Sequence, residues 1–352
     1  MQRGMQDMGT RRAAILAAIM TAALVPAVLL PAAANAAPPG DSPEPVAEVL
    51  ATGLAGPIGS TIGPDGALYV ADRAGGEVVR IDTTTGASTP FATGLPVTGP
   101  GGVFDVTFIG DTAYLLISVV GPDVGGSDVG GIYRVDDVDT TKLIADTANW
   151  SILNPPDADY FVPSGVQFAF VPYGDGFFVT DGHHNRLLFA DLDGEVSEVA
   201  QYANIVPTGL QVDGAKVLMA EAGPIPHDPA TGRVVVVDPM RGSSSPRAVA
   251  AGYSLVVDVE AASCGYYAVS QGDSPGNVEP GTPGLPDSGE LLRVNGNGTF
   301  TAIINELDRP TSLSFVGDTA YIVTLGGDVL VVDDVAPDRH ATWGGCGPKG
   351  QG

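Results

Sequence analysis

Two aspartates of this sequence lie in apolar stretches and could bind a cation. Asp105 stands in Gly-Val-Phe-Asp-Val, and Asp258 stands in Leu-Val-Val-Asp-Val. Carboxylates gathered around one axis would suit Ca²⁺, which takes about six to eight oxygen ligands from carboxylates, carbonyls and water. Asp105 and Asp258 are therefore candidate calcium ligands, and the sequence indicates no other cofactor.

Histidine and serine offer weaker candidates for chemistry. His183 and His184 are adjacent, and neighbours on an extended chain point to opposite sides, so they cannot share a zinc ion that needs several convergent ligands. Ser270, in Ala-Val-Ser-Gln-Gly, resembles a nucleophile elbow. Such an elbow needs a strand-to-helix turn, whereas this strand leads into a Pro- and Gly-rich loop. No residue is predicted to be catalytic.

A repeat must position these side chains. The stretch Gly-Asp-Thr-Ala-Tyr at 110–114 recurs letter for letter at 317–321, and similar glycine-led strands begin at Gly66, Gly176 and Gly214. Each copy follows a Pro or Gly turn and precedes a β-branched strand that ends in Asp or Asn. Six such units with room for four short strands each predict an all-β fold, a six-bladed β-propeller of four-stranded blades.

The ends of the array predict how the ring closes. The sixth unit stops near Val335 after three strands, while the first unit begins with an unpartnered strand at 46–50. If the N-terminal strand completes the last blade, no open sheet edge is left. The propeller is therefore expected to span residues 46–335.

The flanking segments predict an exported protein. Arg11 and Arg12 precede an apolar stretch, which is followed by the small-residue triplet at 34–36. This pattern is typical of a signal peptide, expected here at 1–36, with cleavage after Ala36 and a linker at 37–45. The protein should then be secreted or periplasmic, with no membrane attachment after cleavage.

The net charge of the chain indicates which partners to exclude, and its cysteine content indicates a disulfide. The chain has 41 acidic and 16 basic residues and a net charge of −25, which repels nucleic acid and anionic lipid. Its two cysteines, Cys264 and Cys346, form an even pair in an oxidising compartment. We expect them to form a disulfide that tethers a C-terminal tail at 336–352, although two free thiols are an alternative. The protein is expected to be a monomer.

Several motifs resemble known families. Val-Thr-Asp-Gly-His-His-Asn-Arg-Leu at 179–187 resembles an NHL repeat, and the stretch at 70–82 is a looser copy. Gly53-Leu54, Gly94-Leu95-Pro96 and the stretch at 63–71 resemble the secreted ScyD/ScyE-type proteins, and the whole chain is more distantly similar to the SMP-30/gluconolactonase group. These resemblances imply an extracytoplasmic propeller.

Loop length predicts which face of the disc carries function. Long insertions at 119–131, 222–232 and 271–288 all fall between the second and third strands of their blades. Such loops emerge on one side of the disc, where binding function is usually found; flexible decoration is the alternative. The polar residues expected at this rim are Asp72, Asp105, Asp181, His183, Glu221, Asp258, Gln271 and Arg309. For Asp72 and Asp181 we favour another role, the capping of turns through backbone N–H groups.

Two functions remain in competition. The first is a non-enzymatic binding module that recognises a protein, glycan or small molecule at the loop-rich face. The alternative is a calcium-dependent, SMP-30-like lactonase or hydrolase at the channel mouth. That resemblance implies a metal-binding glutamate on the first inner strand, and the strand at 57–62 has none. An accessory role in secondary-metabolite assembly rests on the ScyD/ScyE resemblance alone.

Overall fold

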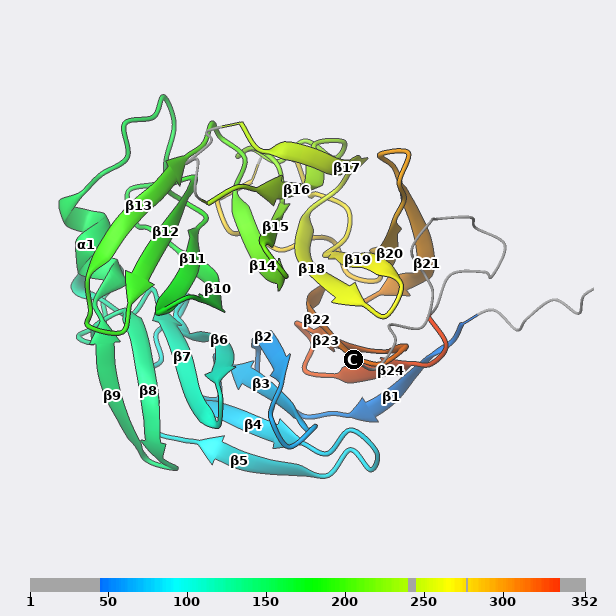
Figure 1. Cartoon of the computed structure of the whole chain (residues 1–352), viewed down its shortest axis with the longest axis horizontal. Coiled ribbons are helices and arrows are strands. Elements are labelled where there is room, and N and C mark those ends of the chain that lie inside the picture. Colours follow the sequence, from blue (N-terminus) through cyan, green and yellow to red (C-terminus); the bar gives the residue numbers. More distant parts are fainter. Residues whose placement is uncertain (1–44, 240–244, 277, 336–352) are drawn as a thin grey trace, which may run out of the picture. The chain divides into compact units, whose positions relative to one another are not determined.

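The ring of strands in Figure 1 is the architecture that the repeat predicts. The computed structural model describes residues 45–239, 245–276 and 278–335. They form six four-stranded antiparallel sheets around a central axis. The prediction of a six-bladed β-propeller with four-stranded blades is confirmed.

Each of the first three blades is a run of consecutive strands, with the first strand innermost (Figure 1). Blade 1 consists of β2 (Pro57–Ile62), β3 (Leu68–Asp72), β4 (Glu77–Ile81) and β5 (Ser88–Ala92). Blade 2 consists of β6 (Gly102–Ile109), β7 (Thr112–Ser118), β8 (Gly131–Asp137) and β9 (Thr140–Ala145). Blade 3 consists of β10 (Gln167–Tyr173), β11 (Gly176–Asp181), β12 (Arg186–Asp191) and β13 (Val196–Gln201).

The remaining blades repeat this order, except that the last one borrows a strand. Blade 4 consists of β14 (Pro207–Asp213), β15 (Lys216–Glu221), β16 (Gly232–Val237) and β17 (Arg247–Tyr253). Blade 5 consists of β18 (Val256–Ala262), β19 (Gly265–Ser270), β20 (Gly289–Val294) and β21 (Phe300–Leu307). Blade 6 consists of β22 (Pro310–Val316), β23 (Thr319–Thr324), β24 (Val329–Val332) and β1 (Ala47–Ala51).

Ring closure follows the prediction. Strand β1 pairs antiparallel with β24, with Ala47 opposite Val332 and Val49 opposite Leu330. The first strand of the fold therefore covers the outer edge of the last blade. This pairing joins the two ends of the propeller through backbone hydrogen bonds and leaves β24 with no open edge.

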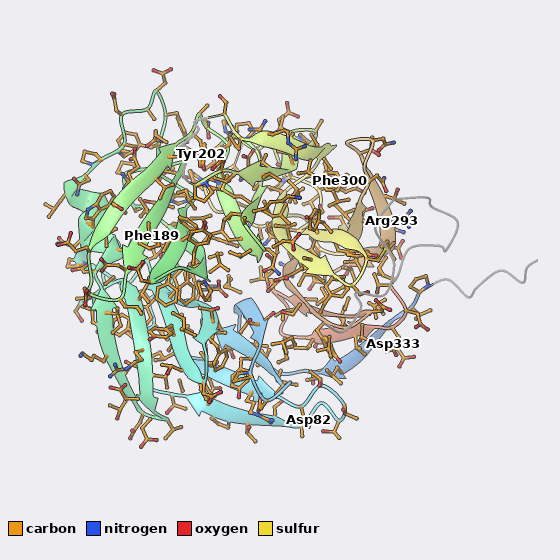
Figure 2. The ribbon with its side chains drawn as sticks, in the orientation of Figure 1. Asp82, Phe189, Tyr202, Arg293, Phe300 and Asp333 are labelled. Carbon is orange, nitrogen blue, oxygen red and sulfur yellow. The ribbon has the colours of Figure 1, made fainter. Side chains whose placement is uncertain are left out.

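Side chains packed between blades explain the repeated sequence (Figure 2). Tyr114, the last residue of the recurring five-residue stretch, lies with its ring centroid 4.9 Å from that of Phe177 in the next blade. Its counterpart Tyr321 donates a 3.4 Å hydrogen bond from its hydroxyl to the Thr83 carbonyl, across the junction of blades 6 and 1. An aromatic ring with a polar tip suits this place, because the ring is buried and the hydroxyl reaches a turn.

The glycine that begins the repeated stretch makes a tight turn on one face of the disc. Gly110, Gly174, Gly214 and Gly317 each follow an innermost strand, with φ between 57° and 63°. A side chain is disfavoured in this left-handed region, so glycine permits the two-residue turn into the second strand. We call this side of the disc the turn face.

The opposite side, the loop-rich face, carries the long connections. They link second to third strands at 119–130, which includes the short helix η1 (Pro122–Val124), at 222–231 and at 271–288. The sequence prediction located these three. It missed a fourth, residues 146–166 between β9 and β10, which contains the helix α1 (Thr147–Leu153). Connections from the fourth strand of one blade to the first strand of the next emerge on the same face, so all four gather there.

Several predictions fall outside the described residues. These are the signal peptide at 1–36, all but the last residue of the linker, and the tail at 336–352 with Cys346. Cys264 lies in the turn between β18 and β19, and its disulfide with Cys346 stays a prediction. Among the described residues, no helix is long and apolar enough to cross a membrane.

Candidate functional site

In every blade, the second strand ends at the loop-rich face in a buried polar residue. We call these six positions the strand-end ring: Asp72, Ser118, Asp181, Glu221, Ser270 and Thr324, all 3% exposed or less. Each lies opposite the first residue of the innermost strand of its blade, as Asp72 lies opposite Pro57 and Thr324 opposite Pro310. A buried polar group needs hydrogen-bond partners, and the partners of this ring determine what each residue does.

Asp72 caps a turn, which is the alternative that the sequence favoured. Its carboxylate accepts a 2.7 Å hydrogen bond from the Ala55 N–H and a 3.3 Å bond from the Gly75 N–H. The carboxylate thus joins the connection that enters blade 1 to the β3–β4 turn. Each of the two oxygens accepts from a backbone donor.

Asp181 anchors the long connection at 146–166. Its Oδ2 accepts a 2.9 Å hydrogen bond from Ser151 Oγ in α1 and a 3.2 Å bond from Arg186 Nε, and it lies 3.1 Å from His184 Nδ1. Arg186 is 1% exposed and also donates to the Asn154 carbonyl at 2.7 Å. Burial alone would raise the pKa of Asp181, but the hydrogen bond from His184 and the charges of His184 and Arg186 outweigh it, so the pKa is lowered.

Glu221 is buried with only one of its oxygens bonded. Arg233, opposite it on β16, donates from Nε to Glu221 Oε2, whereas Oε1 has no hydrogen-bond partner among the described residues. Burial raises the pKa of Glu221 and the Arg233 charge only partly offsets it. Glu221 therefore retains an acceptor that no described residue satisfies.

Ser270 has a bonding role that leaves no free nucleophile. Its hydroxyl donates to the Ser254 carbonyl at 2.7 Å and accepts from the Gly272 N–H at 3.2 Å. The side chain is 1% exposed. These bonds hold the start of the 271–288 connection against blade 5.

The other predicted rim residues lie partly buried at the loop-rich face and are also bonded within the protein. His183 Nδ1 lies 2.8 Å from the Ser164 carbonyl, and burial lowers the pKa of His183. Gln271 Oε1 accepts a 3.0 Å bond from the Gly284 N–H, and Arg309 Nε donates to Asp308 at 2.7 Å. His183, Gln271 and Arg309 thus hold loops or pair locally, and the contacts do not bring them together into one cluster.

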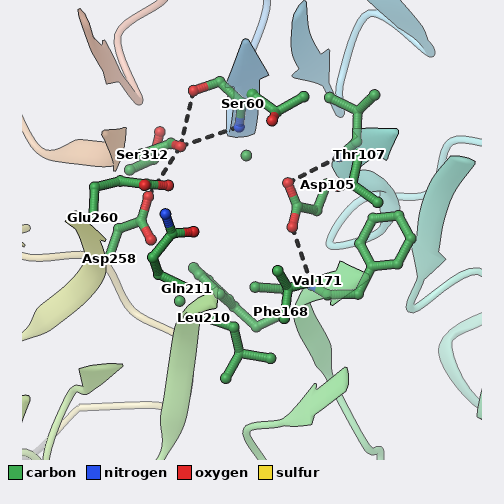
Figure 3. A pocket seen from close by; sticks show the side chains of 17 residues that line it. Ser60, Asp105, Thr107, Phe168, Val171, Leu210, Gln211, Asp258, Glu260 and Ser312 are labelled. Carbon is green, nitrogen blue, oxygen red and sulfur yellow. Dashed lines mark hydrogen bonds between the residues drawn. The ribbon is translucent and has the colours of Figure 1, made fainter. Parts of the chain in front are cut away.

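Asp105 and Asp258, by contrast, face a cavity on the central axis. The cavity has a volume of about 110 Å³ and lies among the innermost strands (Figure 3). Asp105 lies on one side, and Asp258 lies on the other beside Glu260 and Gln211. We call Asp105, Asp258 and Glu260 the channel carboxylates. The innermost strands begin at the loop-rich face, so Asp105 and Asp258 lie nearer that end of the channel than Glu260.

Asp105 and Asp258 are equivalent across the ring. They belong to blades 2 and 5, three blades apart. Asp105 accepts hydrogen bonds from its neighbour Val106 N–H at 2.9 Å and from Phe170 N–H, on the next inner strand, at 3.1 Å. Asp258 likewise accepts from Leu313 N–H on the next inner strand at 2.9 Å. Each carboxylate therefore joins two adjacent blades at the axis.

A glycine beside each carboxylate makes room for it. A Cβ on Gly59 would lie 2.3 Å from Asp105 Oδ1, and a Cβ on Gly209 would lie 2.1 Å from Asp258 Oδ1. Both distances are far below van der Waals contact. The inner strand preceding each aspartate thus has to present glycine at this level.

The channel carboxylates have no cationic partner among the described residues. Burial raises the pKa of Asp258 to about 6, against the opposing effect of its backbone hydrogen bonds. Burial also raises the pKa of Asp105 and of Glu260 well above their ordinary values, and the nearby Asp258 charge adds to both shifts. Removal from water penalises the charged form of each acid, so the channel favours protonated carboxyl groups.

The arrangement of the channel carboxylates does not suit the calcium site that the sequence predicts. Both oxygens of Asp105 and of Asp258 accept backbone hydrogen bonds. Across residues 45–239, 245–276 and 278–335, no group of three or more His, Cys, Asp or Glu side chains could hold a metal ion. Ca²⁺ needs several oxygens that point at one centre, and this donor set does not supply them.

A second and larger cavity opens on the loop-rich face. It has a volume of about 540 Å³ and is formed by two chain segments, residues 157–160 of the long β9–β10 connection and residues 201–204, which begin with the last residue of β13. Tyr202, labelled in Figure 2, belongs to its lining. We call this cavity the face pocket.

Sequence reasoning missed the residues that distinguish both cavities. Glu260 could have been found, because it lies two positions after Asp258 on one strand and alternate residues share a face. The face pocket had no such signal. Asp157, Asp159 and Tyr160 lie in a connection that the repeat did not reveal.

Comparison with known proteins shows the fold and no family. No protein-family model and no curated protein matches the chain. The PQQ-bound aldose sugar dehydrogenase of Streptomyces coelicolor superposes with a TM-score of 0.58 at 15% identity, covering 84% of this chain and 99% of that one. The apo soluble aldose sugar dehydrogenase of Escherichia coli gives 0.55 at 16% identity, covering 82% and 99%.

A gluconolactonase of Xanthomonas campestris is similar in the same way. Its TM-score is 0.53 at 12% identity, covering 84% of this chain and 96% of that one. The distant similarity to gluconolactonase-type propellers is thus supported at the level of the fold. None of these comparisons supports the resemblance to ScyD/ScyE-type proteins.

Proposed function

We propose that the protein is a binding module that acts outside the cytoplasm and recognises a ligand or partner at its loop-rich face. The observation that carries this proposal is the asymmetry between faces. Four long connections gather on one face, whereas four of the inner strands leave the other through two-residue turns begun by a glycine. Long loops on a rigid scaffold are where proteins most often place binding residues.

The strand-end ring supports the proposal, because it holds these loops in defined positions. Asp181 and Arg186 bind the connection at 146–166, and Ser270 binds the connection at 271–288. A surface held in place before binding loses less entropy when a ligand arrives. The loops are therefore organised for recognition.

The place of action rests on the sequence. The predicted signal peptide at 1–36 and the resemblance to secreted ScyD/ScyE-type proteins both favour export. The net charge of −25 disfavours nucleic acid and anionic membranes as partners. The expected ligand is a protein, a glycan or a small molecule outside the cytoplasm. The protein is expected to act as a monomer.

A pair of charge-matched variants tests the location of the site. The purified protein is screened by thermal shift against sugars, sugar lactones, amines and peptides, and each compound that stabilises it is retested on two double variants. Asp157→Asn with Asp159→Asn changes the loop-rich face, and Asp111→Asn with Asp175→Asn changes the turn face. Loss of binding in the first variant alone supports the proposal. Loss in the second alone would overturn it.

The lactonase alternative keeps one supporting observation, the three channel carboxylates that face a single cavity. Its test is hydrolysis of glucono-δ-lactone with added Ca²⁺ and with a chelator. Calcium-dependent hydrolysis above the rate in buffer, lost in Asp105→Asn, would favour this alternative over a binding module. A rate equal to that of buffer under both conditions would remove it.

A further inference from the structure

The face pocket presents hydrogen-bond acceptors to a ligand. Its complete lining is Asp157, Ala158, Asp159, Tyr160, Gln201, Tyr202, Ala203 and Asn204. The two aspartate side chains are exposed, and no lysine or arginine is among the lining residues. A volume of about 540 Å³ lies within the range of ordinary small-molecule sites, about 300 to 1,000 Å³.

Gln201 supplies an acceptor that is already oriented. Its side-chain nitrogen donates to the carbonyls of His184, Asn185 and Tyr202 at 2.9 to 3.1 Å. These bonds fix which way the amide points. The amide oxygen is buried and has no partner among the described residues. A ligand that donates a hydrogen bond would satisfy it.

Tyr202 supports the wall of the pocket, because its side chain packs in the hydrophobic core with Phe178, Leu210 and Met219. The side chain is 3% exposed, and its hydroxyl has no hydrogen-bond partner among the described residues. Burial, and then the charge of nearby Glu221, raise the pKa of Tyr202. Glu221 itself retains an unpartnered oxygen. The Tyr202 hydroxyl is therefore buried within the protein near Glu221, whose charge is paired with Arg233.

The walls of the pocket are held by other parts of the chain. Asn204 exchanges two hydrogen bonds with the backbone of Ile225, at 2.8 and 3.0 Å. The Tyr160 carbonyl accepts from Asn185 Nδ2 at 3.2 Å, and the Tyr160 side chain is 39% exposed. The pocket therefore combines fixed walls, an accessible aromatic ring and two carboxylates.

From this lining we infer that the face pocket binds a small organic cation, an ammonium or guanidinium group carried on an apolar body. The two carboxylates and the accessible Tyr160 ring together favour such a group through charge and cation–π attraction. The same chemistry is offered by a free amine and by a lysine or arginine side chain of a partner peptide. This inference rests on the proposed binding function and names the ligand class.

Isothermal titration of the purified protein with choline tests the inference, and its neutral carbon analogue 3,3-dimethyl-1-butanol is the control. We expect choline to bind and the analogue not to bind. Asp157→Asn with Asp159→Asn should weaken choline binding about tenfold or more, because the attraction of two negative charges for the cation is lost. Asp111→Asn with Asp175→Asn, which removes the same charge from the turn face, should leave it unchanged.

The remaining outcomes distinguish a free amine from a partner's side chain as the source of the cation. They also distinguish failure of this inference from failure of the proposed function. Tighter binding of a Gly-Lys-Gly peptide than of choline would indicate a partner's side chain, and the reverse would indicate a free amine. Equal binding of choline and its analogue, or equal weakening by both double variants, would overturn the inference. If neither cation binds while a neutral compound does so at the loop-rich face, the inference fails and the proposed function stands.

Discussion

Asp181 in the strand-end ring and Asp258 in the channel are both carboxylates deep in the propeller, yet their surroundings are opposite. Asp181 lies against Arg186 and His184 and accepts from Ser151. Asp258 faces Asp105 across a cavity, lies beside Glu260, and among the described residues accepts only from backbone N–H groups and the Ser312 hydroxyl. Its pKa is raised to about 6, whereas that of Asp181 is lowered.

The comparison shows that the two carboxylates differ in whether neighbouring positively charged side chains compensate their charge. At Asp181 the cationic partners outweigh burial, so the carboxylate is held ionised and acts as a structural anchor, whereas at Glu221 the single partner Arg233 only partly offsets burial. Burial raises the pKa of a carboxylate that has no cationic partner among the described residues, so the channel carboxylates titrate closer to neutral pH than an ordinary carboxyl group. In this propeller, the ring supports the loops and the channel holds the titratable groups.

The largest effect is expected from breaking the anchor. Asp181→Asn should lower the free energy of unfolding by about 3 to 5 kcal/mol, because it leaves the buried Arg186 with only the more exposed Glu198 as a charge partner. Urea denaturation measures the change. Asp65→Asn, which removes the exposed partner of Arg80, is the control and should have a much smaller effect. Equal losses in the two variants would contradict a structural role for the ring.

A smaller effect should follow from crowding the channel. Gly209→Ala places a Cβ 2.1 Å from Asp258 Oδ1 and 2.7 Å from its Cα, and should cost about 1 to 3 kcal/mol of stability. Gly99→Ala has no atom within 4 Å of the new Cβ, so its stability should match that of the unchanged protein. A tolerated Gly209→Ala would show that Asp258 does not occupy this position.

The dependence of stability on pH gives a third and smaller difference. The folded pKa of Asp258, about 6, is raised above its ordinary value of 3.8. The protonated Asp258 carboxyl therefore contributes its full stabilisation below pH 3.8, and this contribution is lost as the pH rises through about 6. Asp105 and Glu260 act in the same direction. Unfolding free energies measured across this window should fall with pH, and less steeply in Asp258→Asn. Parallel curves would contradict the shift.

Much of the fold could be predicted because it repeats. The recurring Gly-Asp-Thr-Ala-Tyr stretch encodes a tight turn and an interblade tyrosine, and such local requirements appear directly in the sequence. The unpartnered strand near the N-terminus likewise indicated the closure by β1. The connection at 146–166 escaped detection because its helix and turns lie outside the repeat.

The candidate site was harder to predict, because the position of a residue along its strand does not reveal which side chains contact it in the fold. Asp72, Asp105, Asp181 and Asp258 all appeared as candidates for one rim. Only the structure separates Asp181, beside the buried Arg186, from Asp258, beside Gly209. Arg186 is five residues from Asp181 but lies on the next strand, and Gly209 comes from another blade.

The most direct test of this division is a carboxyl titration by carbon-13 NMR on protein with labelled aspartate, with Asp181→Asn and Asp258→Asn to assign the two signals. The account predicts that Asp258 titrates with a midpoint near 6 and that Asp181 titrates below 3.8. Midpoints that coincide near the ordinary value, or that fall in the reverse order, would contradict the distinction between anchoring and titratable carboxylates.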